Sequence, residues 1–327
     1  MSTARHVIAL LKSYLEGEEQ HFLSVALQMA AHEARQGHTK VAQDIQNLVD
    51  KAKERKFVTE HKTSPTPLVQ PKGELVNLVS VQYSDTRLID MVLPVALKKR
   101  LERIIVEQTQ RHRLAEYNLK PRRKILLVGP PGSGKSMTAT ALAGELKLPL
   151  FTVAYTGLIT KYMGDTANQL KLVFDAMATT RGVYFFDEFD AIGSQRAAVN
   201  DVGEIRRVLN SCLQFLENDD SQSLIVAATN HPDLLDKALF RRFDDVIEYE
   251  LPNPEVVRKL LTARLSSFEI KWQDWQHIIK IADGLSQAEL VRAADDAAKA
   301  AVISGQKLIA EENIISAILE RKNIVFK

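Results

Sequence analysis

The sequence contains very little cysteine: Cys212 is the single one among 327 residues. One cysteine cannot form a disulfide within the chain, which excludes a small secreted domain stabilised by disulfides. Cys212 lies in the apolar, helix-like stretch from Val208 to Leu216. This position predicts a buried structural thiol rather than a redox or catalytic one.

Long apolar runs and a strong net charge are also missing. No run approaches the roughly 20 apolar residues that span a bilayer, and the first residues lack the apolar core of a signal peptide. We therefore expect no membrane segment and a cytoplasmic location. The net charge of +2 argues against nucleic acid as a partner. The chain length predicts two or three domains.

The most informative segment is Gly129-Pro-Pro-Gly-Ser-Gly-Lys-Ser136, which fits the phosphate-binding pattern G-x-x-x-x-G-K-[ST] and follows the apolar run Lys124–Val128. In this pattern backbone N–H groups surround the phosphates, the lysine reaches the β- and γ-phosphates, and the hydroxyl holds Mg²⁺. The residues expected to contact the nucleotide are Pro131, Gly132, Ser133, Gly134, Lys135, Ser136 and Met137.

A second apolar run, Val183–Phe186, ends at the acidic pair Asp187 and Glu188. Asp187 is the expected Mg²⁺ ligand with Ser136, and Glu188 is the expected group that polarises the attacking water. A glycine-rich turn that matches by chance is the alternative. The acidic pair argues against it, because unpaired charges at the end of a buried strand are costly. The sequence thus predicts an ATPase that uses ATP and Mg²⁺.

The two ends of the chain are predicted to be helical. Residues 1–60 show apolar positions at helical spacing, with breaks near Gly17 and Gly37, and predict a small three-helix module that recruits a partner or substrate. Residues 61–84 begin with a proline-rich stretch and are expected to be a linker. Beyond Pro252 the pattern is helical alone, which predicts a separate helical subdomain over 252–327.

The central region, residues 85–251, alternates β-rich runs with helical stretches. The five runs are Ile125–Val128, Leu150–Ala154, Val183–Phe186, Leu224–Ala228 and Val246–Tyr249. This order predicts an α/β fold, a doubly wound parallel five-stranded sheet with its ligand at the carboxyl ends of the strands. The basic run Lys120–Lys124 before the first of these strands is expected to be solvated.

The order of these motifs resembles the AAA+ family of ATPases, the branch that includes katanin, spastin and the membrane-anchored AAA proteases. The resemblance covers residues 85–325 and suggests a compact bacterial type. It implies that Asn230, after the strand Leu224–Ala228, positions the lytic water. It also implies that Arg241 and Arg242 reach the nucleotide of a neighbouring subunit. Relatives usually have two residues between these arginines. Which of the two is the arginine finger, the residue that contacts the neighbour's transferred phosphate, therefore stays open.

The resemblance extends to the helical subdomain and to the adenine site. Gly284-Leu-Ser-Gln-Ala-Glu-Leu290 is similar to the lid motif G-x-S-G-A-[DE]-L, with Gln287 in place of a glycine. It implies that Gly284 and Ala288 border the adenosine, while Ser286 and Glu289 also form a helix-capping pair. Asp90 and Met91 stand where relatives line the adenine pocket.

A further segment resembles the first pore loop of the family: Lys161, Tyr162, Met163 and Gly164. An aromatic ring and a thioether can grip many side chains without demanding a sequence. The resemblance implies a homo-oligomer, a hexamer, that threads a protein substrate. The alternative is a regulatory ATPase that controls a partner such as a protease. Nucleic-acid translocation is disfavoured by the net charge and the aromatic loop.

Overall fold

The computed structural model describes residues 75–153, 166–190, 202–235, 237–272 and 274–325, together with positions 26, 29, 30, 43 and 73. The chain divides into two compact units, Met1–Thr66 and Pro67–Lys327. In the first unit the described positions 26, 29, 30 and 43 are helical. The rest of the predicted helical module over 1–60 lies outside the described residues.

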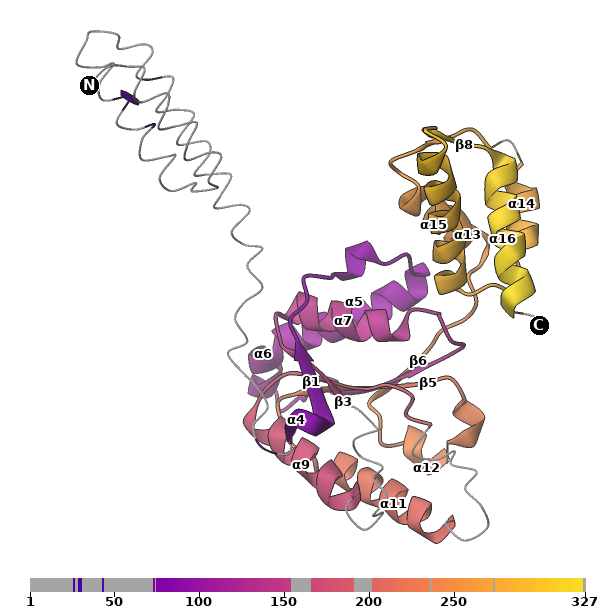
Figure 1. The fold of residues 1–327 in the computed structure, drawn as a ribbon. Helices are drawn as coiled ribbons and strands as arrows, with labels where there is room; N and C mark the ends of the chain where they lie inside the picture. Colours follow the sequence, from indigo (N-terminus) through magenta and orange to yellow (C-terminus); the bar gives the residue numbers. More distant parts are fainter. Residues whose placement is uncertain are drawn as a thin grey trace. The chain divides into compact units, whose positions relative to one another are not determined.

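A six-stranded sheet forms the centre of the second unit, with the strand order β1-β3-β4-β5-β2-β6 (Figure 1). Its strands are β1 (Val79–Gln82), β2 (Lys124–Val128), β3 (Leu150–Val153), β4 (Val183–Phe186), β5 (Leu224–Thr229) and β6 (Asp245–Glu248). The strands β2 to β6 pair in parallel and correspond to the five predicted ones. The fold is therefore the predicted α/β class with one additional strand.

The additional strand corrects the predicted linker over 61–84. Residues Leu75–Leu78 form the short helix α4, and β1 follows it and pairs antiparallel with β3. Leu78 and Val79 are buried in the core of the sheet. A four-residue edge strand directly after a proline-rich stretch gives little periodicity, because only two valines alternate with polar residues.

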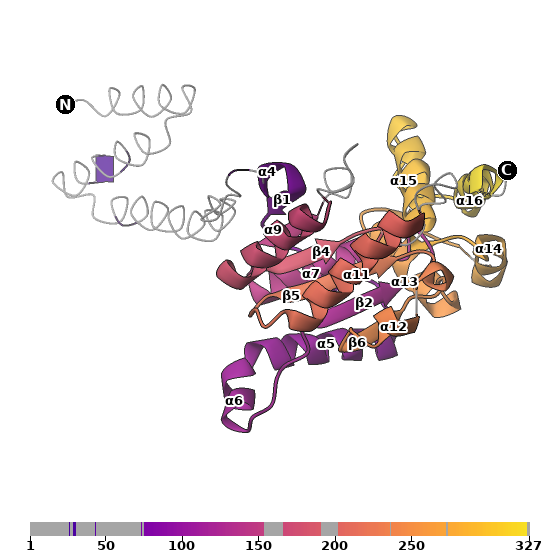
Figure 2. The ribbon, with the colours of Figure 1, turned by 90° about the horizontal axis from the view of Figure 1, so that it is seen from below.

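Helices cover both faces of the sheet (Figures 1 and 2). They are α5 (Val95–Thr109), α6 (Arg111–Glu116), α7 (Lys135–Leu146), α9 (Thr166–Thr179), α11 (Val202–Asn218) and α12 (Lys237–Phe240), with the 3-10 turns η2 (Leu88–Asp90) and η4 (Pro232–Leu234). Successive residues of β2 alternate between two cores: Ile125 packs in the core with α5 and α7, and Leu126 packs in the core with α9 and α11. Both faces of β2 are thus apolar, as expected of a central parallel strand.

The helical lid after Asn253 has a core of its own. It comprises α13 (Pro254–Arg264), α14 (Trp275–Ala282), α15 (Gln287–Ile303) and α16 (Glu311–Val325). The prediction of helices alone is wrong at two short places, because β7 (Glu269–Ile270) and β8 (Leu308–Ile309) pair in parallel. The indole of Trp272 fixes this pair by donating to the carbonyl of Ile309 at 2.9 Å.

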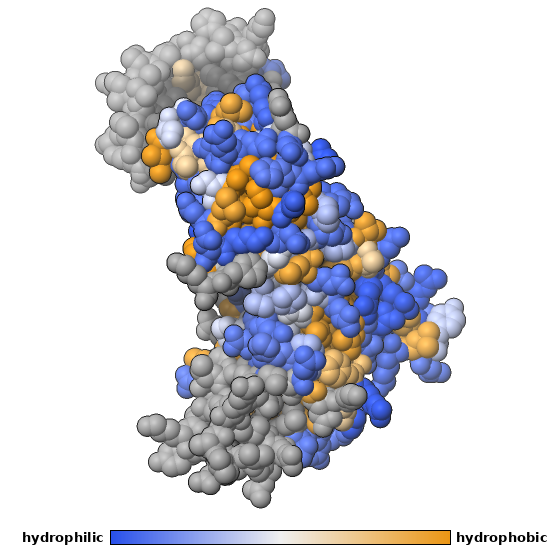
Figure 3. All heavy atoms as spheres, turned by 90° about the vertical axis from the view of Figure 1, so that its right-hand side faces the viewer, coloured by the Kyte–Doolittle hydropathy of each residue, from blue (hydrophilic) through white to orange (hydrophobic). Residues whose placement is uncertain are grey.

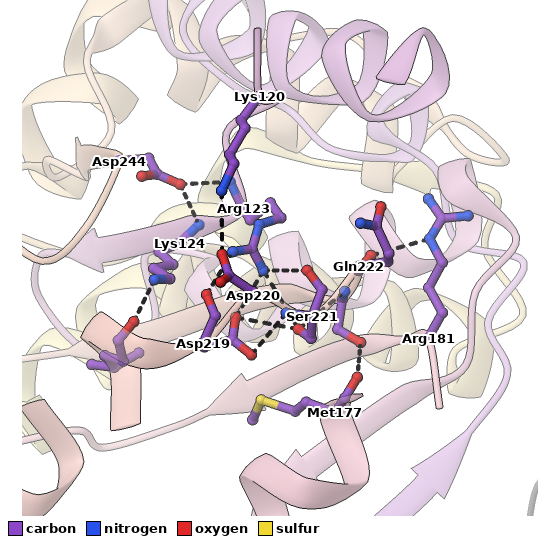
Figure 4. Close-up of polar contacts among 12 residues, drawn as sticks. Lys120, Arg123, Lys124, Met177, Arg181, Asp219, Asp220, Ser221, Gln222 and Asp244 are labelled. Carbon is purple, nitrogen blue, oxygen red and sulfur yellow. Dashed lines mark hydrogen bonds and ion pairs between the residues drawn. The ribbon is translucent and has the colours of Figure 1, made fainter. Parts of the chain in front are cut away.

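The basic run before β2 is not simply solvated. The Arg123 side chain is 11% exposed and forms a 2.7 Å ion pair with Asp219, which is 4% exposed. A second Arg123 nitrogen donates to the Asp219 carbonyl, and the Lys124 ammonium donates to the Leu216 carbonyl (Figure 4). The Asp244 carboxylate accepts from the backbone N–H groups of Arg123 and Lys124 at 2.7 and 2.9 Å. The run therefore ties α11 and the start of β6 to the start of β2.

The described surface and interior agree with the composition. Figure 3 shows a mainly hydrophilic face with a compact hydrophobic patch in its upper half. No helix within the described ranges combines the length and apolar character needed to cross a membrane.

Cys212 is 1% exposed, and burial raises the pKa of its thiol from 9.0 to about 12. The predicted burial of this thiol is confirmed.

Candidate active site

The sheet order brings three predicted segments to one edge. Strand β5 lies between β4 and β2, and all three run in parallel. Asp187 follows β4, Asn230 follows β5 and Gly129 follows β2. Because the carboxyl ends of parallel strands meet at one edge, residues as far apart in the sequence as Gly129 and Asn230 form one site.

The loop after β2 has the conformation that a phosphate cradle requires. Gly132 and Gly134 have φ angles of 74° and 98°, in the left-handed region that favours glycine. A Cβ on Gly132 would lie 2.5 Å from the Ser286 hydroxyl of the lid, so this position also lacks space. Helix α7 begins at Lys135 and directs its N-terminus into the loop.

Lys135 is held in place by three acceptors. Its ammonium donates to the carbonyls of Gly129 and Pro130 and to Oδ1 of Asn230, each at 2.8 Å. Burial lowers the pKa of Lys135, and the carboxylates of Asp187 and Asp190 act in the opposite direction. Bound phosphates would further favour the charged form. Because Oδ1 of Asn230 accepts from Lys135, Nδ2 of Asn230 remains as the donor that a ligand can use.

A hydroxyl and a carboxylate meet where a cation is predicted. The Ser136 hydroxyl donates to Oδ2 of Asp187 at 2.9 Å. Both groups are hard oxygen ligands, the kind that Mg²⁺ prefers when phosphate oxygens and waters complete its shell. The described residues contain no cluster of three or more His, Cys, Asp or Glu that could hold a metal without such help. The donor set therefore fits a Mg²⁺–nucleotide rather than a protein-only metal site.

Glu188 has an unusual backbone. Its φ angle is 50°, which is rare for a residue with a side chain, and the side chain is exposed. Its N–H donates to Oδ1 of Asp187 at 2.9 Å. The predicted base is therefore next to the predicted metal ligand and accessible to solvent.

Sequence reasoning did not single out Asp190, which the structure places behind this pair. Asp190 is 8% exposed, and its carboxylate accepts from the Thr229 hydroxyl at 2.8 Å and from the Asn230 N–H at 3.3 Å. It fixes the end of β5, and with it Asn230, relative to the end of β4. The third carboxylate in Asp187-Glu-Phe-Asp190 was the signal that could have identified it.

A cavity of about 750 Å³ lies between the phosphate loop and the lid. This volume is within the range of small-molecule and cofactor sites. Predicted residues that line it are Asp90, Met91, Pro131, Gly132, Gly134, Lys135, Ser136, Met137, Asp187, Glu188, Asn230 and Ala288. Predicted contacts that are not among its lining residues are Ser133, Gly284, Arg241 and Arg242.

The lid supplies most of the lining that sequence reasoning missed. The lining residues that were missed are Val92, which lies outside the lid, and six residues of the lid: Leu260, Ala263, Arg264, Gln287, Val291 and Arg292. Helix α15 touches the loop directly, since the Ala288 N–H donates to the Gly132 carbonyl at 3.0 Å. Ser286 caps α15 by accepting from the Glu289 N–H at 3.3 Å, as its position in the motif predicted. Ser133 is 1% exposed and its hydroxyl has no hydrogen-bond partner among the described residues.

The two adjacent arginines differ in their surroundings. Arg242 forms a 2.6 Å ion pair with Glu217 of α11 and donates to the Ala238 carbonyl at 3.2 Å. Arg241 is exposed and makes no ion pair within the described part of the chain.

The predicted pore-loop residues Lys161, Tyr162, Met163 and Gly164 lie outside the described residues.

Comparison with known proteins agrees with this geometry. Residues 125–251 match the model of the ATPase family associated with various cellular activities (AAA). An uncharacterized AAA family ATPase, y4kL of Sinorhizobium fredii, is 30% identical over 94% of this chain and 92% of its own length. The chain belongs to the AAA ATPase family. This AAA ATPase has the predicted P-loop fold and the predicted reaction, ATP hydrolysis.

Other relatives are longer. The AAA ATPase is 31% identical to the ATP-dependent zinc metalloprotease FtsH of Sulfurovum sp. over 77% of its own length, but spans only 40% of that relative. It is also 31% identical to the proteasome-activating nucleotidase of Pyrococcus abyssi over 75% of its length and 63% of the relative. The crystal structure of the FIGL-1 AAA domain has the same fold, with a TM-score of 0.61 at 22% identity over 79% of this chain and 91% of that one.

Proposed function

We propose that this AAA ATPase remodels proteins as a ring, with six subunits, and that each ATP site is completed by the neighbouring subunit. One observation carries the proposal: neither Arg241 nor Arg242 lines the cavity formed by its own chain. Arg241 is exposed and free of ion pairs within the described residues, so its guanidinium is available to a second molecule.

The two arginines have different tasks in this proposal. Arg241 is the finger, because a permanently charged, forked donor can neutralise charge on the transferred phosphoryl group. Arg242 keeps its ion pair with Glu217 and holds the finger segment against α11. Ser136 and Asp187 would hold Mg²⁺, which supplies neutralisation of phosphate charge, and Asn230 and Glu188 would orient and polarise the attacking water.

The site geometry supports ATP turnover at this cavity, and three further features support the mechanical use of that turnover. The segment Lys161–Gly164 has the composition of a gripping loop. Two relatives carry names that link ATP to proteolysis, a proteasome-activating nucleotidase and an ATP-dependent metalloprotease. The lid exposes large apolar side chains suited to contact with another subunit, at Val302, Ile303, Leu308 and Ile324.

The domain roles follow from this proposal. Residues 85–251, together with the edge strand β1, form the ATPase core and 252–327 the lid, while the module over 1–60 recruits the protein substrate or an effector. The second candidate is a regulatory ATPase whose nucleotide state controls such an effector without threading. The same relatives' names support it, because activation of a protease is compatible with either mode.

A mixing experiment tests the shared site. Lys135→Ala removes a subunit's own phosphate contact, and Arg241→Ala removes what it gives to its neighbour, so each variant alone should be inactive. Random 1:1 assembly makes about a quarter of the interfaces complete, and ATP turnover should recover to that order. The control mixture of Lys135→Ala with Glu188→Gln should stay inactive, since no site then has both residues. Failure of the first mixture to recover would contradict the shared site.

A further inference from the structure

The residue that departs from the lid motif, Gln287, lies at the junction of lid and phosphate loop. It is the first residue of α15, directly after the capping residue Ser286. The next residue, Ala288, donates its N–H to the Gly132 carbonyl at 3.0 Å. A backbone hydrogen bond thus joins the residue after Gln287 to the loop, and the Ser286 hydroxyl before it lies 2.5 Å from the point where a Cβ on Gly132 would stand.

The side chain of Gln287 faces the loop glycine that precedes Lys135. Its Oε1 lies 3.5 Å from the point where a Cβ on Gly134 would stand, and Gln287 lines the cavity. The methyl carbon of Met91 lies 3.7 Å from the same point. An amide and a thioether thus flank Gly134, and the amide is the polar group of the two.

The amide of Gln287 has no hydrogen-bond partner among the residues that the structure describes, although the residue is half-buried. The two lid arginines of the cavity are engaged: Arg264 with Asp295 at 2.5 and 3.0 Å, and Arg292 with Glu289 at 2.9 Å. Gln287 is the lid side chain with uncommitted donors closest to the loop glycine.

We propose that Gln287 binds the nucleotide directly, with its amide nitrogen donating to an oxygen of the α- or β-phosphate. The inference rests on the proposed ATP site. The backbone of the phosphate loop binds these phosphates, and their oxygens accept but do not donate, so the amide must present its nitrogen. The lid then contributes a polar contact to ATP and to ADP alike, and nucleotide binding is coupled to the position of α15.

The test uses two substitutions of opposite charge. Isothermal titration calorimetry of the full chain with ADP and Mg²⁺ measures affinity for wild type, Gln287→Glu and Gln287→Lys. Glutamate keeps the shape of glutamine but replaces the amide donors with a negative charge. ADP should therefore bind about tenfold more weakly, a loss of about 1.4 kcal/mol in binding free energy. Lysine restores a donor, so affinity should stay within about threefold of wild type or increase. Gln306→Glu and Gln306→Lys, at an exposed position beyond the end of α15, are the matched controls and should leave affinity unchanged.

The outcomes separate the possibilities. Weakening by glutamate but not by lysine supports the contact, because a side chain that only packs away from the phosphates would not respond to the sign of the charge. Equal weakening by both, or no effect of either, overturns it. If the wild-type protein bound neither ADP nor ATP, the proposed ATP site itself would be contradicted. That outcome is distinct from one in which the wild-type protein binds ADP but the Gln287 variants show no dependence on charge.

Discussion

Glu188 combines an exposed carboxylate with a backbone that few side-chain residues adopt. A left-handed φ at such a residue costs on the order of 1–3 kcal/mol and persists only where the surroundings enforce it. Here the enforcement comes from the Asp187 carboxylate, which accepts from the Glu188 N–H, and from the Phe189 N–H, which donates to the Ala228 carbonyl at 2.7 Å. Strain held by both neighbouring residues points to a function for Glu188.

Replacement of Glu188 by glutamine should separate binding from turnover. The amide keeps the shape but cannot accept a proton, so the turnover number should fall by about 10²–10⁴ while ATP affinity stays near that of wild type. Steady-state phosphate release and calorimetry with ATP measure the two quantities. Glu312→Gln, an exposed glutamate of α16, serves as control. Equal turnover in Glu188→Gln and wild type would refute the assignment of the base.

The link between α11, β2 and β6 gives a prediction about stability. Asp219 and Asp220 are neighbours in the sequence, but Asp219 pairs with buried Arg123, whereas Asp220 pairs with Lys120 at a site where both side chains are more than four-fifths exposed. Asp219→Ala leaves a buried charge unpaired and should cost about 3–5 kcal/mol in the free energy of unfolding. Asp220→Ala should leave it nearly unchanged, because an exposed ion pair is screened by solvent.

Urea denaturation measures both variants, and calorimetry with ADP provides an independent readout. The ion pair lies at the start of β2 and the phosphate loop follows its end, so the folded Asp219→Ala protein should bind ADP with wild-type affinity. Equal stability losses in the two variants would show that burial at Asp219 has no energetic consequence. A selective loss of ADP affinity in Asp219→Ala would show that the two ends of β2 are coupled.

The elements that the sequence predicts well are those with strong local signals. The strands β2 to β6 are apolar runs with turn residues on either side, and the phosphate loop is a motif whose glycines have a backbone function. The sequence signal fails where the partner is distant: β1 depends on pairing with β3, and the burial of Arg123 depends on Asp219, 96 residues away. Asp190 is a further case, since its role emerges only when β4 and β5 lie side by side.

In the whole molecule, the residues proposed for ATP chemistry all lie within the described ranges, while the proposed mechanical step depends on a loop outside them. An ATP-driven ring needs a group that contacts the polypeptide but not the nucleotide, and Tyr162 is the proposed group. Its aromatic ring can contact varied side chains without a fixed partner. Threading therefore predicts that loss of this ring uncouples hydrolysis from work on a protein substrate.

The test compares Tyr162→Ala with Tyr117→Ala, which removes a tyrosine that is 71% exposed and is not among the residues that line the cavity. Each protein is given ATP, Mg²⁺ and a folded fluorescent protein with an unstructured tail, and loss of fluorescence is recorded beside phosphate release. Tyr162→Ala should keep ATP turnover within about threefold of wild type and lose at least about tenfold in unfolding rate, since binding and hydrolysis use other residues. Tyr117→Ala should match wild type in both. Equal unfolding by Tyr162→Ala and wild type would remove the gripping role of the loop, and a wild-type protein that hydrolyses ATP without unfolding the substrate would favour the regulatory ATPase.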